Sequence, residues 1–355
     1  MKFFSQKLLI WYDRYKRDLP WRRTKDPYHI WVSEVMLQQT TVNAVIPYYK
    51  RWFKTYPTVF DLAQAPLQQV LKSWQGLGYY NRARNLHKAA SMVVCDYQGQ
   101  WPQDYQTVRR LPGFGPYTAG SVLSIAFDQP LVIIDANIRR VVMRLMAIKA
   151  HADTRQDKTI EKFLRKIFPL TRAGDFNQAL MELGALVCRN KEPLCNLCPL
   201  KKFCKAYTKG WQEIIPTPKK KIIQDIHAAI AIIQRQGRYF LQKRPSRGLL
   251  ADLWEFPGGK LNHKESQKEA LSRELKEELG VDLKNAHYLF DVTHFYTQFR
   301  VKLSVWQCIL KKYPPTDPRH QWVSFKGFSN YPMPSGSAKI VDRIRTHLTN
   351  AAKTI

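Results

Sequence analysis

Four cysteines close to residue 200 have a spacing that suits a metal centre. They are separated by six, two and five residues, whereas Cys95 and Cys308 stand apart. The four are Cys188, Cys195, Cys198 and Cys204. Four thiolates can surround a structural zinc ion or an iron-sulfur cube. Zinc sites usually combine two C-x2-C pairs and this run contains one, so its uneven spacing favours a 4Fe-4S cluster, with zinc as the alternative.

A glycine turn upstream is suited to bind a phosphate. Gly113 and Gly115 lie in the stretch Leu-Pro-Gly-Phe-Gly-Pro-Tyr-Thr, which leads into an apolar helix expected over 119–127. Such a turn points backbone amides at a ligand in front of a helix N-terminus. Downstream, Asp135 and Asn137 lie in Ile-Asp-Ala-Asn, where the aspartate would also cap a helix that starts near Asn137.

Three glutamates in the second half of the chain share one helical face. Glu274, Glu277 and Glu278 have the spacing i, i+3, i+4. Their like charges repel, and a divalent cation such as Mg²⁺ would relieve the repulsion. A solvated acidic face is the alternative for three such glutamates alone, but here they belong to a longer pattern that starts at Gly259.

These groups require two kinds of scaffold. Residues 1–210 alternate periodic apolar segments with turn residues, which predicts an all-α domain. The segment 215–221, Ile-Pro-Thr-Pro-Lys-Lys-Lys, has the composition of an exposed linker. Beyond it, the patterns of 226–233 and 238–242 around a Gln-Gly turn, and a charged helix over 269–279, predict an α+β domain. We therefore expect domains at 1–210 and 225–355, joined by a linker at 211–224.

The charge of the chain indicates a polyanionic partner. Lys and Arg number 57 against 28 Asp and Glu, a net charge of +29, of which +18 lies in residues 1–210 and +11 in the rest. Nucleic acid is the first expectation and an anionic membrane surface the second, with a charge that serves only solubility as the alternative. A content of 45% hydrophobic residues excludes a disordered basic tail.

The chain shows no sign of membrane insertion or secretion. An apolar run such as 228–233 is far shorter than the ~20 residues that span a bilayer, and residues 1–17 read as an amphipathic helix rather than a signal peptide. We expect a monomer without a membrane partner in the cytoplasm, associated with the nucleoid if the source is bacterial, where thiols stay reduced.

Residues 1 to about 210 resemble the helix-hairpin-helix DNA glycosylases and, within that superfamily, the MutY adenine glycosylases. The matching stretches are Leu19-Pro-Trp-Arg22, Asp26-Pro-Tyr28, Trp31-Val-Ser-Glu-Val-Met-Leu-Gln-Gln-Thr40, Gly76-Leu-Gly-Tyr-Tyr80, Arg82-Ala-Arg-Asn-Leu-His87 and the cysteine run. The resemblance implies a hydrolase of base excision repair that removes adenine paired with 8-oxoguanine or guanine in double-stranded DNA. It also implies a 4Fe-4S cluster on the four cysteines.

This reaction needs an acid for the leaving base and a carboxylate for an oxocarbenium-like sugar. The resemblance assigns the acid to Glu34, which would protonate adenine at N7, and burial beside Val35 and Met36 would raise its pKa. It assigns the second carboxylate to Asp135, and the placing of the water to Asn137. An exposed helix glutamate is the alternative for Glu34, and a plain helix cap for Asp135, although Asp135 can do both.

Position 117 indicates how the sugar is attacked. Glycosylases of this superfamily that also cut the strand carry a lysine there, which forms a Schiff base. This chain has Tyr117, which predicts a monofunctional glycosylase with the tyrosine in the site but not bonded to the sugar.

The resemblance also implies contacts to the flipped base and its duplex. The residues that enter or wedge the base stack would be Gln38, Gln39 and Tyr79. The residues that line the adenine pocket would be Trp21, Arg22 and Glu182. For Trp21 and Tyr79 a role in an aromatic core is an equal alternative. Ala136 departs from the glycine usual in the family, which is tolerated unless its φ must be positive.

The pattern from Gly259 matches a complete Nudix box, Gly259-x5-Glu265-x7-Arg273-Glu-Leu-Lys-Glu-Glu-Leu-Gly-Val281. With Trp254-Glu-Phe-Pro-Gly-Gly-Lys260 in front of it, the domain resembles MutT more closely than the usual MutY reader of 8-oxoguanine. The box implies Mg²⁺ on Gly259, Glu274, Glu277 and Glu278, and hydrolysis of oxidised nucleotides such as 8-oxo-dGTP. The alternative is a module that only reads 8-oxoguanine.

Two features leave the nucleotide preference and the lesion reader open. In the resemblance to MutT, the purine-reading asparagine of MutT aligns near Ser335, in Pro332-Met-Pro-Ser335, where this chain has no asparagine. The Phe-Ser-His signature of MutY has no obvious counterpart, and 293–295 or 296–298 are the candidate substitutes.

Two other functions are conceivable for the first domain. An endonuclease III-like enzyme for oxidised pyrimidines is disfavoured by Tyr117 and by the Gln38-Gln39 pair. A non-enzymatic iron-sulfur protein that binds DNA would keep the glycine turn and the cysteines, but would have no use for Glu34 together with Asp135.

Overall fold

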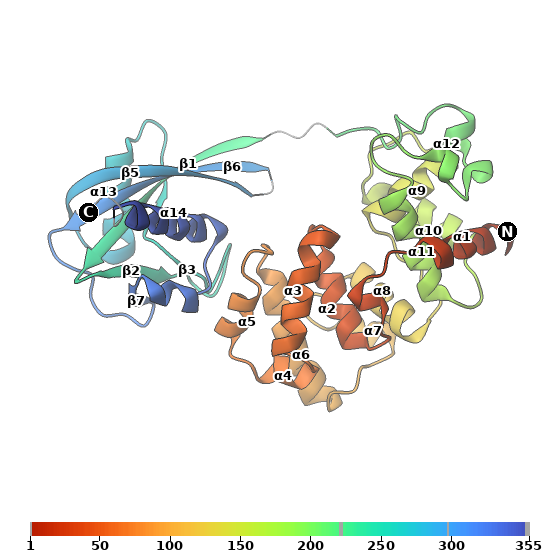
Figure 1. The fold of residues 1–355 in the computed structure, drawn as a ribbon, viewed down its shortest axis with the longest axis horizontal. Helices are drawn as coiled ribbons and strands as arrows, with labels where there is room; N and C mark the ends of the chain where they lie inside the picture. Colours follow the sequence, from red (N-terminus) through yellow and green to blue (C-terminus); the bar gives the residue numbers. More distant parts are fainter. Residues whose placement is uncertain (1, 220–222, 297, 352–355) are drawn as a thin grey trace. The chain divides into compact units, whose positions relative to one another are not determined.

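The computed structural model describes residues 2–219, 223–296 and 298–351, and side chains in these ranges except at 2, 296 and 347–351. The chain divides into two compact units, each described by itself here: Met1–Gln64 with Asn85–Lys220, and Ala65–Arg84 with Lys221–Ile355 (Figure 1). Within the described ranges, no helix has the length and apolar character to cross a membrane.

The first unit is helical, which confirms the all-α prediction. Its α-helices are α1 (Lys2–Tyr15), α2 (Pro27–Leu37), α3 (Val42–Thr55), α4 (Val59–Gln64), α7 (Tyr105–Arg109), α8 (Pro116–Phe127), α9 (Ala136–Met146), α10 (Asp157–Ile167), α11 (Ala173–Leu186) and α12 (Lys205–Thr208). Short 3-10 helices are η1 (Pro20–Arg22), η2 (Thr154–Gln156), η3 (Cys195–Leu197) and η4 (Lys201–Phe203). α6 (Asn81–Tyr97) begins in the second unit, which also contains α5 (Leu67–Ser73).

The helices that carry the expected chemistry lie at the centre of the first unit. α2, α8, α9 and α11 pack against one another. In α2 every residue from 30 to 36 is buried, so the helix is covered on all sides and the Glu34 side chain does not reach solvent. Sequence signals start these helices: Asp26 caps α2 ahead of Pro27, and Asp135 caps α9.

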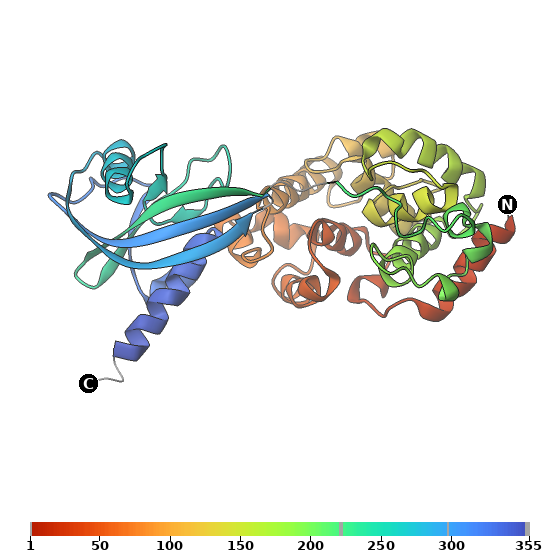
Figure 2. The same cartoon turned by 90° about the horizontal axis from the view of Figure 1, so that it is seen from above.

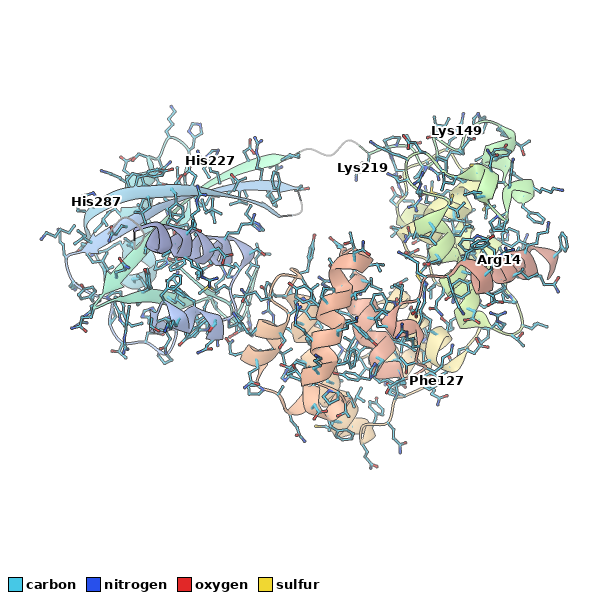
Figure 3. All side chains as sticks on the ribbon, in the orientation of Figure 1. Arg14, Phe127, Lys149, Lys219, His227 and His287 are labelled. Carbon is cyan, nitrogen blue, oxygen red and sulfur yellow. The ribbon has the colours of Figure 1, made fainter. Side chains whose placement is uncertain are left out.

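The last part of the first unit forms the cysteine loop and the start of the linker. Lys149, labelled in Figure 3, places its ammonium group 3.5 Å from the ring centroid of Trp211. Thr217 N donates to Ala150 O at 2.8 Å, so the chain stays attached to this unit up to that point. Residues 220–222 of the predicted linker lie outside the described residues.

The second unit is built on a mixed sheet, which confirms the α+β prediction. The strands are β1 (Gln224–Arg235), β2 (Arg238–Lys243), β3 (Trp254–Glu255), β4 (Gly258–Lys260), β5 (Leu283–Tyr296), β6 (Phe299–Leu310) and β7 (His320–Ser324). The order is β3-β2-β1-β6-β5, with β4 on β1 and β7 on β2. β1 and β6 run parallel, and the other pairs are antiparallel.

Two helices cover the two faces of this sheet. Ile230 and Ile232 of β1 point into a core shared with α14 (Ser335–Ala351), whereas Ala229, Ala231 and Ile233 point into a core shared with α13 (Gln267–Leu279). Figure 2 shows α13 (teal) and α14 (blue) on opposite sides of the strands. The alternation is the period of two expected for a strand buried on both faces. The remaining element is η5 (Lys326–Asn330).

Candidate active site

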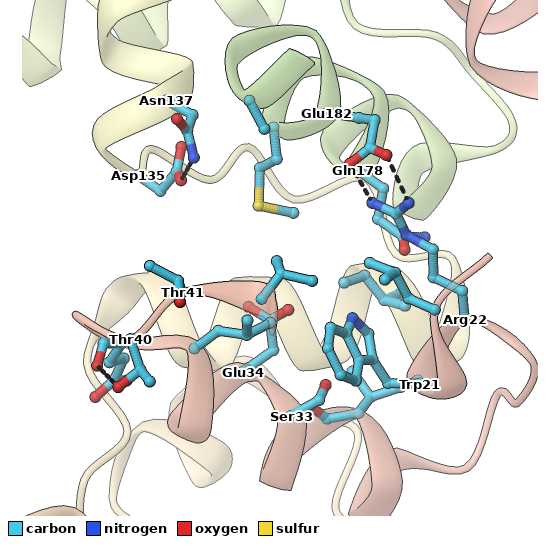
Figure 4. A pocket seen from close by; sticks show the side chains of 18 of the residues that line it. Trp21, Arg22, Ser33, Glu34, Thr40, Thr41, Asp135, Asn137, Gln178 and Glu182 are labelled. Carbon is cyan, nitrogen blue, oxygen red and sulfur yellow. Dashed lines mark hydrogen bonds and ion pairs between the residues drawn. The ribbon is translucent and has the colours of Figure 1, made fainter. Parts of the chain in front are cut away.

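A cavity of about 620 Å³ lies among the central helices of the first unit (Figure 4). It is lined by η1, α2 and the turn after it, α8, the start of α9, and α11. Nine residues that the sequence singled out lie in its wall: Trp21, Arg22, Glu34, Gln38, Gln39, Tyr117, Asp135, Asn137 and Glu182. The fold therefore brings together groups that are up to 161 positions apart in the sequence.

Glu34 is a buried acid in this wall. Glu34 is 6% exposed, and the Tyr117 hydroxyl donates a hydrogen bond of 2.7 Å to Glu34 Oε2. Burial raises the pKa of Glu34, although the bond from Tyr117 acts in the opposite direction. Burial likewise raises the pKa of Tyr117 well above its usual value, so that its hydroxyl is a neutral donor. A carboxyl group in this setting holds its proton to a higher pH than an exposed glutamate does.

Asp135 faces the cavity as the N-cap of α9. Its Oδ1 accepts from Ile138 N at 2.6 Å, and its Oδ2 accepts from Asn137 Nδ2 at 3.1 Å (Figure 4). Burial raises the pKa of Asp135, while these hydrogen bonds and Arg140 lower it in part. Ala136 follows as the first residue of α9 and does not have a positive φ, so the alanine fits where the family usually has glycine.

Glu182 is held by two arginines. The carboxylate, on a side chain that is 1% exposed, accepts from Arg17 Nε at 2.8 Å and Nη2 at 2.7 Å, and from Arg22 Nη1 at 3.1 Å and Nη2 at 2.9 Å. Burial alone would raise the pKa of Glu182, but the guanidinium groups outweigh it and lower the pKa to about 2. Glu182 is therefore an ionised group in the wall of the cavity. Arg17 carried no motif and was missed, because 165 residues separate it from its partner.

The other expected DNA contacts are arranged as follows. Gln38 Nε2 donates to Thr118 Oγ1 at 3.3 Å, and Gln39 has a positive φ of 58° in the turn after α2. Gly113 takes a φ of 81°, and Gly115 is the N-cap of α8, so the glycine turn does precede a helix N-terminus. Tyr79 belongs to the second unit and does not line the cavity.

Trp21 is both a core residue and a cavity residue. Its ring packs edge-on against Tyr49 at 5.4 Å between centroids, and the residue is 6% exposed. The same residue lines the cavity next to Arg22 and Glu182 (Figure 4). The two roles that the sequence left open are therefore compatible.

The four cysteines of the run line one small hollow together with Arg144. Burial raises the pKa of the thiols of Cys195, Cys198 and Cys204, that of Cys198 to about 12. In the described ranges, no group of three or more His, Cys, Asp or Glu side chains is arranged to hold a metal ion.

Arg144 is a buried cation beside this hollow. It donates to Cys188 Sγ at 3.3 Å and to the carbonyl oxygens of Cys188, Arg189, Asn190 and Ile215. Among the described residues, no carboxylate forms an ion pair with Arg144. A buried guanidinium group needs a negative counterpart, and thiolates around a metal centre would supply it.

A chain of hydrogen bonds runs from the cavity to the cysteine loop. Arg140 Nη2 donates to Asn137 Oδ1 at 2.9 Å, and Arg140 Nε donates to Cys188 O at 2.9 Å. Asn137 in turn donates to Asp135. The start of α9 and the first cysteine are therefore held in one network.

In the second unit, two of the three Nudix glutamates, Glu274 and Glu277, contact Arg273. Its Nη1 donates to Glu274 at 2.8 Å and to Glu277 at 3.3 Å. Glu277 is 61% exposed, whereas Glu278 is held by Gln242 Nε2 at 2.7 Å and Gly258 N at 3.2 Å. Burial raises the pKa of Glu278. Gln242 was missed because it lies on β2, outside the box.

Gly259 lies directly against one of these glutamates. A Cβ at this position would lie 2.2 Å from the Glu274 carboxylate, so a side chain here would displace that carboxylate. The glycine of the box therefore makes room for a carboxylate. Ser335 begins α14, and Thr297 of the candidate lesion-reading segments lies outside the described residues.

Comparison with known proteins matches each part of the chain to a known family. Residues 32–169 match the model of the HhH-GPD superfamily of base excision DNA repair proteins, and residues 228–343 match that of the NUDIX domain. A solved thermostable thymine-DNA glycosylase has a TM-score of 0.53 at 31% identity, covering 59% of this chain and 96% of that one. A trapped endonuclease III-DNA covalent intermediate has a TM-score of 0.51 at 28% identity, covering 59% and 95%. The helical unit and its buried acid therefore define a base excision DNA repair enzyme.

Curated relatives narrow the class. An adenine DNA glycosylase of Mus musculus is 34% identical over 99% of this chain and 79% of its own length, and that of Homo sapiens is 33% identical over 95% and 73%. One of Buchnera aphidicola is 41% identical over 72% and 73%. The chain belongs to the adenine DNA glycosylase family, hydrolases of N-glycosyl bonds in base excision repair. The endonuclease III-like and the non-enzymatic alternatives are thereby set aside.

Proposed function

We propose that this adenine DNA glycosylase removes adenine paired with 8-oxoguanine or guanine from duplex DNA and leaves the strand uncut. The observation that carries the proposal is the buried acid Glu34, hydrogen-bonded to Tyr117, in the same cavity as the second carboxylate, Asp135. An acid for the base and a carboxylate for the sugar are the two groups that the reaction needs.

Glu34 acts as the general acid in the proposed mechanism. It gives its proton to adenine N7, and the electrons of the breaking C1′–N9 bond pass into the base. Asp135 faces the positive charge that develops on the sugar, and Asn137 holds the water that adds to C1′. Tyr117 has no amine, so it forms no Schiff base and leaves the sugar-phosphate strand intact.

Adenine is held by the wall opposite Glu34. Glu182 is kept ionised by Arg17 and Arg22, so it accepts a hydrogen bond from the exocyclic amino group of adenine. Guanine carries a carbonyl oxygen at that position, which an ionised carboxylate repels. Trp21 supplies an apolar ring surface beside the adenine.

Base release requires the adenine to leave the duplex, and the remaining expected residues serve that step. Gln38, Gln39 and Tyr79 enter the stack, and the amides of the Gly113 to Gly115 turn bind a backbone phosphate ahead of α8. Tight turns at these positions support the assignment: φ is 58° at Gln39, 49° at Tyr79 and 81° at Gly113.

Base release from a defined duplex tests the proposal. A duplex with one adenine opposite 8-oxoguanine is expected to lose that base with wild-type protein, and the strand should break only after alkali. Borohydride should trap no covalent complex. Strand cleavage before alkali would contradict the monofunctional assignment, and release of thymine or oxidised pyrimidines instead of adenine would contradict the substrate.

We further propose that Cys188, Cys195, Cys198 and Cys204 hold a 4Fe-4S cluster. The residues fit the group because the four thiols line one hollow and the buried Arg144 lacks a negative partner there. When bound, the cluster supplies a negatively charged cross-link that closes the loop. Iron and sulfide in the purified protein support the cluster; a colourless protein with one zinc per chain would contradict it.

For the second unit we propose a Mg²⁺-dependent hydrolase of oxidised nucleoside triphosphates such as 8-oxo-dGTP. Gly259, Glu274, Glu277 and Glu278 would hold the ion, which supplies charge neutralisation for the pyrophosphate. Release of pyrophosphate from 8-oxo-dGTP is the test. A protein that binds 8-oxoguanine in DNA but hydrolyses no nucleotide would be a reader module instead.

The domain boundaries 1–210, 211–224 and 225–355 are proposed with these functions. They assign the cysteine loop to the glycosylase and the Nudix box to the second domain, and limited proteolysis in the linker tests them. The monomeric state and the location in the cytoplasm, with nucleoid association in a bacterium, are proposed with them and need size-exclusion and imaging measurements.

A further inference from the structure

Met181 makes a polar contact in the cavity that the mechanism does not use. It lies on the face of α11 that also carries Gln178, Glu182 and Ala185 and lines the cavity. Its Sδ lies 3.4 Å from the Tyr117 hydroxyl oxygen, in hydrogen-bonding geometry. The same hydroxyl lies 2.7 Å from Glu34 Oε2.

A tyrosine hydroxyl has one proton, so its two acceptors compete for it. An ionised carboxylate is a much stronger acceptor than a thioether and takes the proton whether or not the sulfur is present. A protonated Glu34 is a weaker acceptor, and the thioether then gains a share. The sulfur contact therefore stabilises the protonated state of Glu34 relative to the ionised state.

We propose that Met181 is a positioning residue for acid catalysis: its sulfur gives the Tyr117 hydroxyl a second acceptor, which favours the proton-loaded state of Glu34. The inference rests on the proposed role of Glu34. It adds a function for a residue that belongs to no motif and whose side chain is apolar apart from its sulfur.

Other groups around Glu34 do not replace this contact. The charged and titratable groups that face it are Tyr117 of α8, Asp135 at the start of α9 and Arg22 of η1. Asp135 disfavours the ionised form of Glu34, and Arg22 favours it. Ser121, one turn along α8, lowers the pKa of both Glu34 and Tyr117, as a hydroxyl that donates to their ionised forms would, so it opposes the effect of the Met181 contact rather than replacing it.

Substituting Met181 by leucine and by glutamine tests the proposal. Leucine keeps the volume and removes the acceptor. The rate of single-turnover adenine release should then begin to fall at a pH about half a unit lower than in wild type. A shift of this size corresponds to the free energy of one neutral hydrogen bond. Glutamine offers an amide oxygen, and the fall is expected at or above the wild-type pH. A leucine profile that coincides with wild type would overturn the proposal.

A double-mutant cycle separates this role from simple packing. In a Tyr117→Phe background the competing proton is absent, so Met181→Leu should shift the profile no further. An equal shift in both backgrounds, or an equal loss of rate at every pH, would show that Met181 acts by shape alone and would refute the proposal. Thermal unfolding of each variant checks that the fold is retained.

A readout independent of catalysis distinguishes this proposal from the proposed function. In protein labelled with ¹³C at the glutamate carboxyl, the Glu34 signal, assigned by its loss in Glu34→Gln, reports the protonation of Glu34 without DNA. Its titration should move to lower pH in Met181→Leu. If that shift is seen but the wild type releases no adenine, the hydrogen-bond competition stands and the acid assignment fails. If adenine is released and no shift is seen, the competition fails.

Discussion

Asp135 Oδ1 accepts a hydrogen bond of 2.6 Å from the backbone N–H of Ile138, so the proposed catalytic carboxylate also caps the helix that carries it. Different substitutions of Asp135 should therefore affect the stability of the helix and the rate of adenine release separately. Asparagine is as good an N-cap as aspartate, but it has no negative charge to place against a cationic sugar.

The first prediction follows from that pair of roles. Asp135→Asn should release adenine at least about 100-fold more slowly at nearly unchanged thermal stability, whereas Asp135→Ala should lose both the activity and about 1 kcal/mol of unfolding free energy. Single-turnover kinetics and urea unfolding measure the two effects. Equal stability of the two variants would contradict the capping role.

The second prediction concerns the pH dependence of base release. Because burial raises the pKa of Glu34, the acid should be protonated below that pKa, and the rate should fall as the pH rises through it. Glu34→Gln keeps the shape but cannot donate a proton, so release should drop by about 100-fold or more. DNA binding, followed by fluorescence anisotropy, should persist. Release by Glu34→Gln equal to wild type would exclude the acid role.

The third prediction concerns the arginine pair around Glu182. Arg17→Met leaves Arg22 alone with a buried carboxylate, and the unfolding free energy should fall by about 1–2 kcal/mol at pH 7. The lowered pKa of Glu182 means that this contribution is present above its unfolded pKa and is lost as the pH falls towards about 2. The difference between variant and wild type should therefore shrink in acid. Arg14→Met, at an exposed position of α1, is the matched control and should have little effect.

The fourth prediction concerns the cysteine loop. Arg144→Met removes the buried guanidinium group that donates to four carbonyl oxygens, and the unfolding free energy should fall by about 3 kcal/mol or more. Iron per chain should fall with it, since the loop would no longer be held closed. Arg155→Met serves as the control, because Arg155 is an exposed residue that pairs with the neighbouring Asp153. Full iron content in Arg144→Met would contradict the structural role.

The fifth prediction concerns the Nudix box. Glu277 is largely exposed, so Glu277→Gln should abolish hydrolysis of 8-oxo-dGTP without unfolding the protein. Glu269 lies on the same helix but completes the capping box with Ser266, and glutamine serves equally well there. Glu269→Gln should therefore keep the hydrolase activity. Pyrophosphate release measures both, and adenine release should be unaffected in either variant.

Much of the site could be predicted because its chemistry is concentrated in short motifs. Glu34 lies in an apolar helix, Asp135 stands directly before a helix that needs a cap, and the glutamates share one helical face. The roles of Glu34 and Asp135 were implied by the resemblance of the motifs around them, whereas the shared face of the three glutamates follows from helical spacing alone. The two-domain composition followed from the change between helical and strand periodicity near residue 220.

The residues that were missed act across long stretches of chain. Arg17 has its partner 165 positions away, and Met181 contacts a hydroxyl 64 positions away. No periodicity or spacing links such pairs, because they meet only when helices from different parts of the chain pack together. Gln242 was missed for the same reason: it lies on a strand, and its partner Glu278 lies on the helix that covers the sheet.

Arg144 also has a consequence for how the protein is made. Its guanidinium group holds the carbonyl oxygen of Ile215, which lies 71 positions further along the chain, at 2.7 Å. During synthesis the cysteines emerge from the ribosome before Ile215 does, so the loop cannot reach its final shape until the start of the linker has been made. A nascent chain stopped just after Cys204 would expose all four thiols around an incompletely bonded arginine.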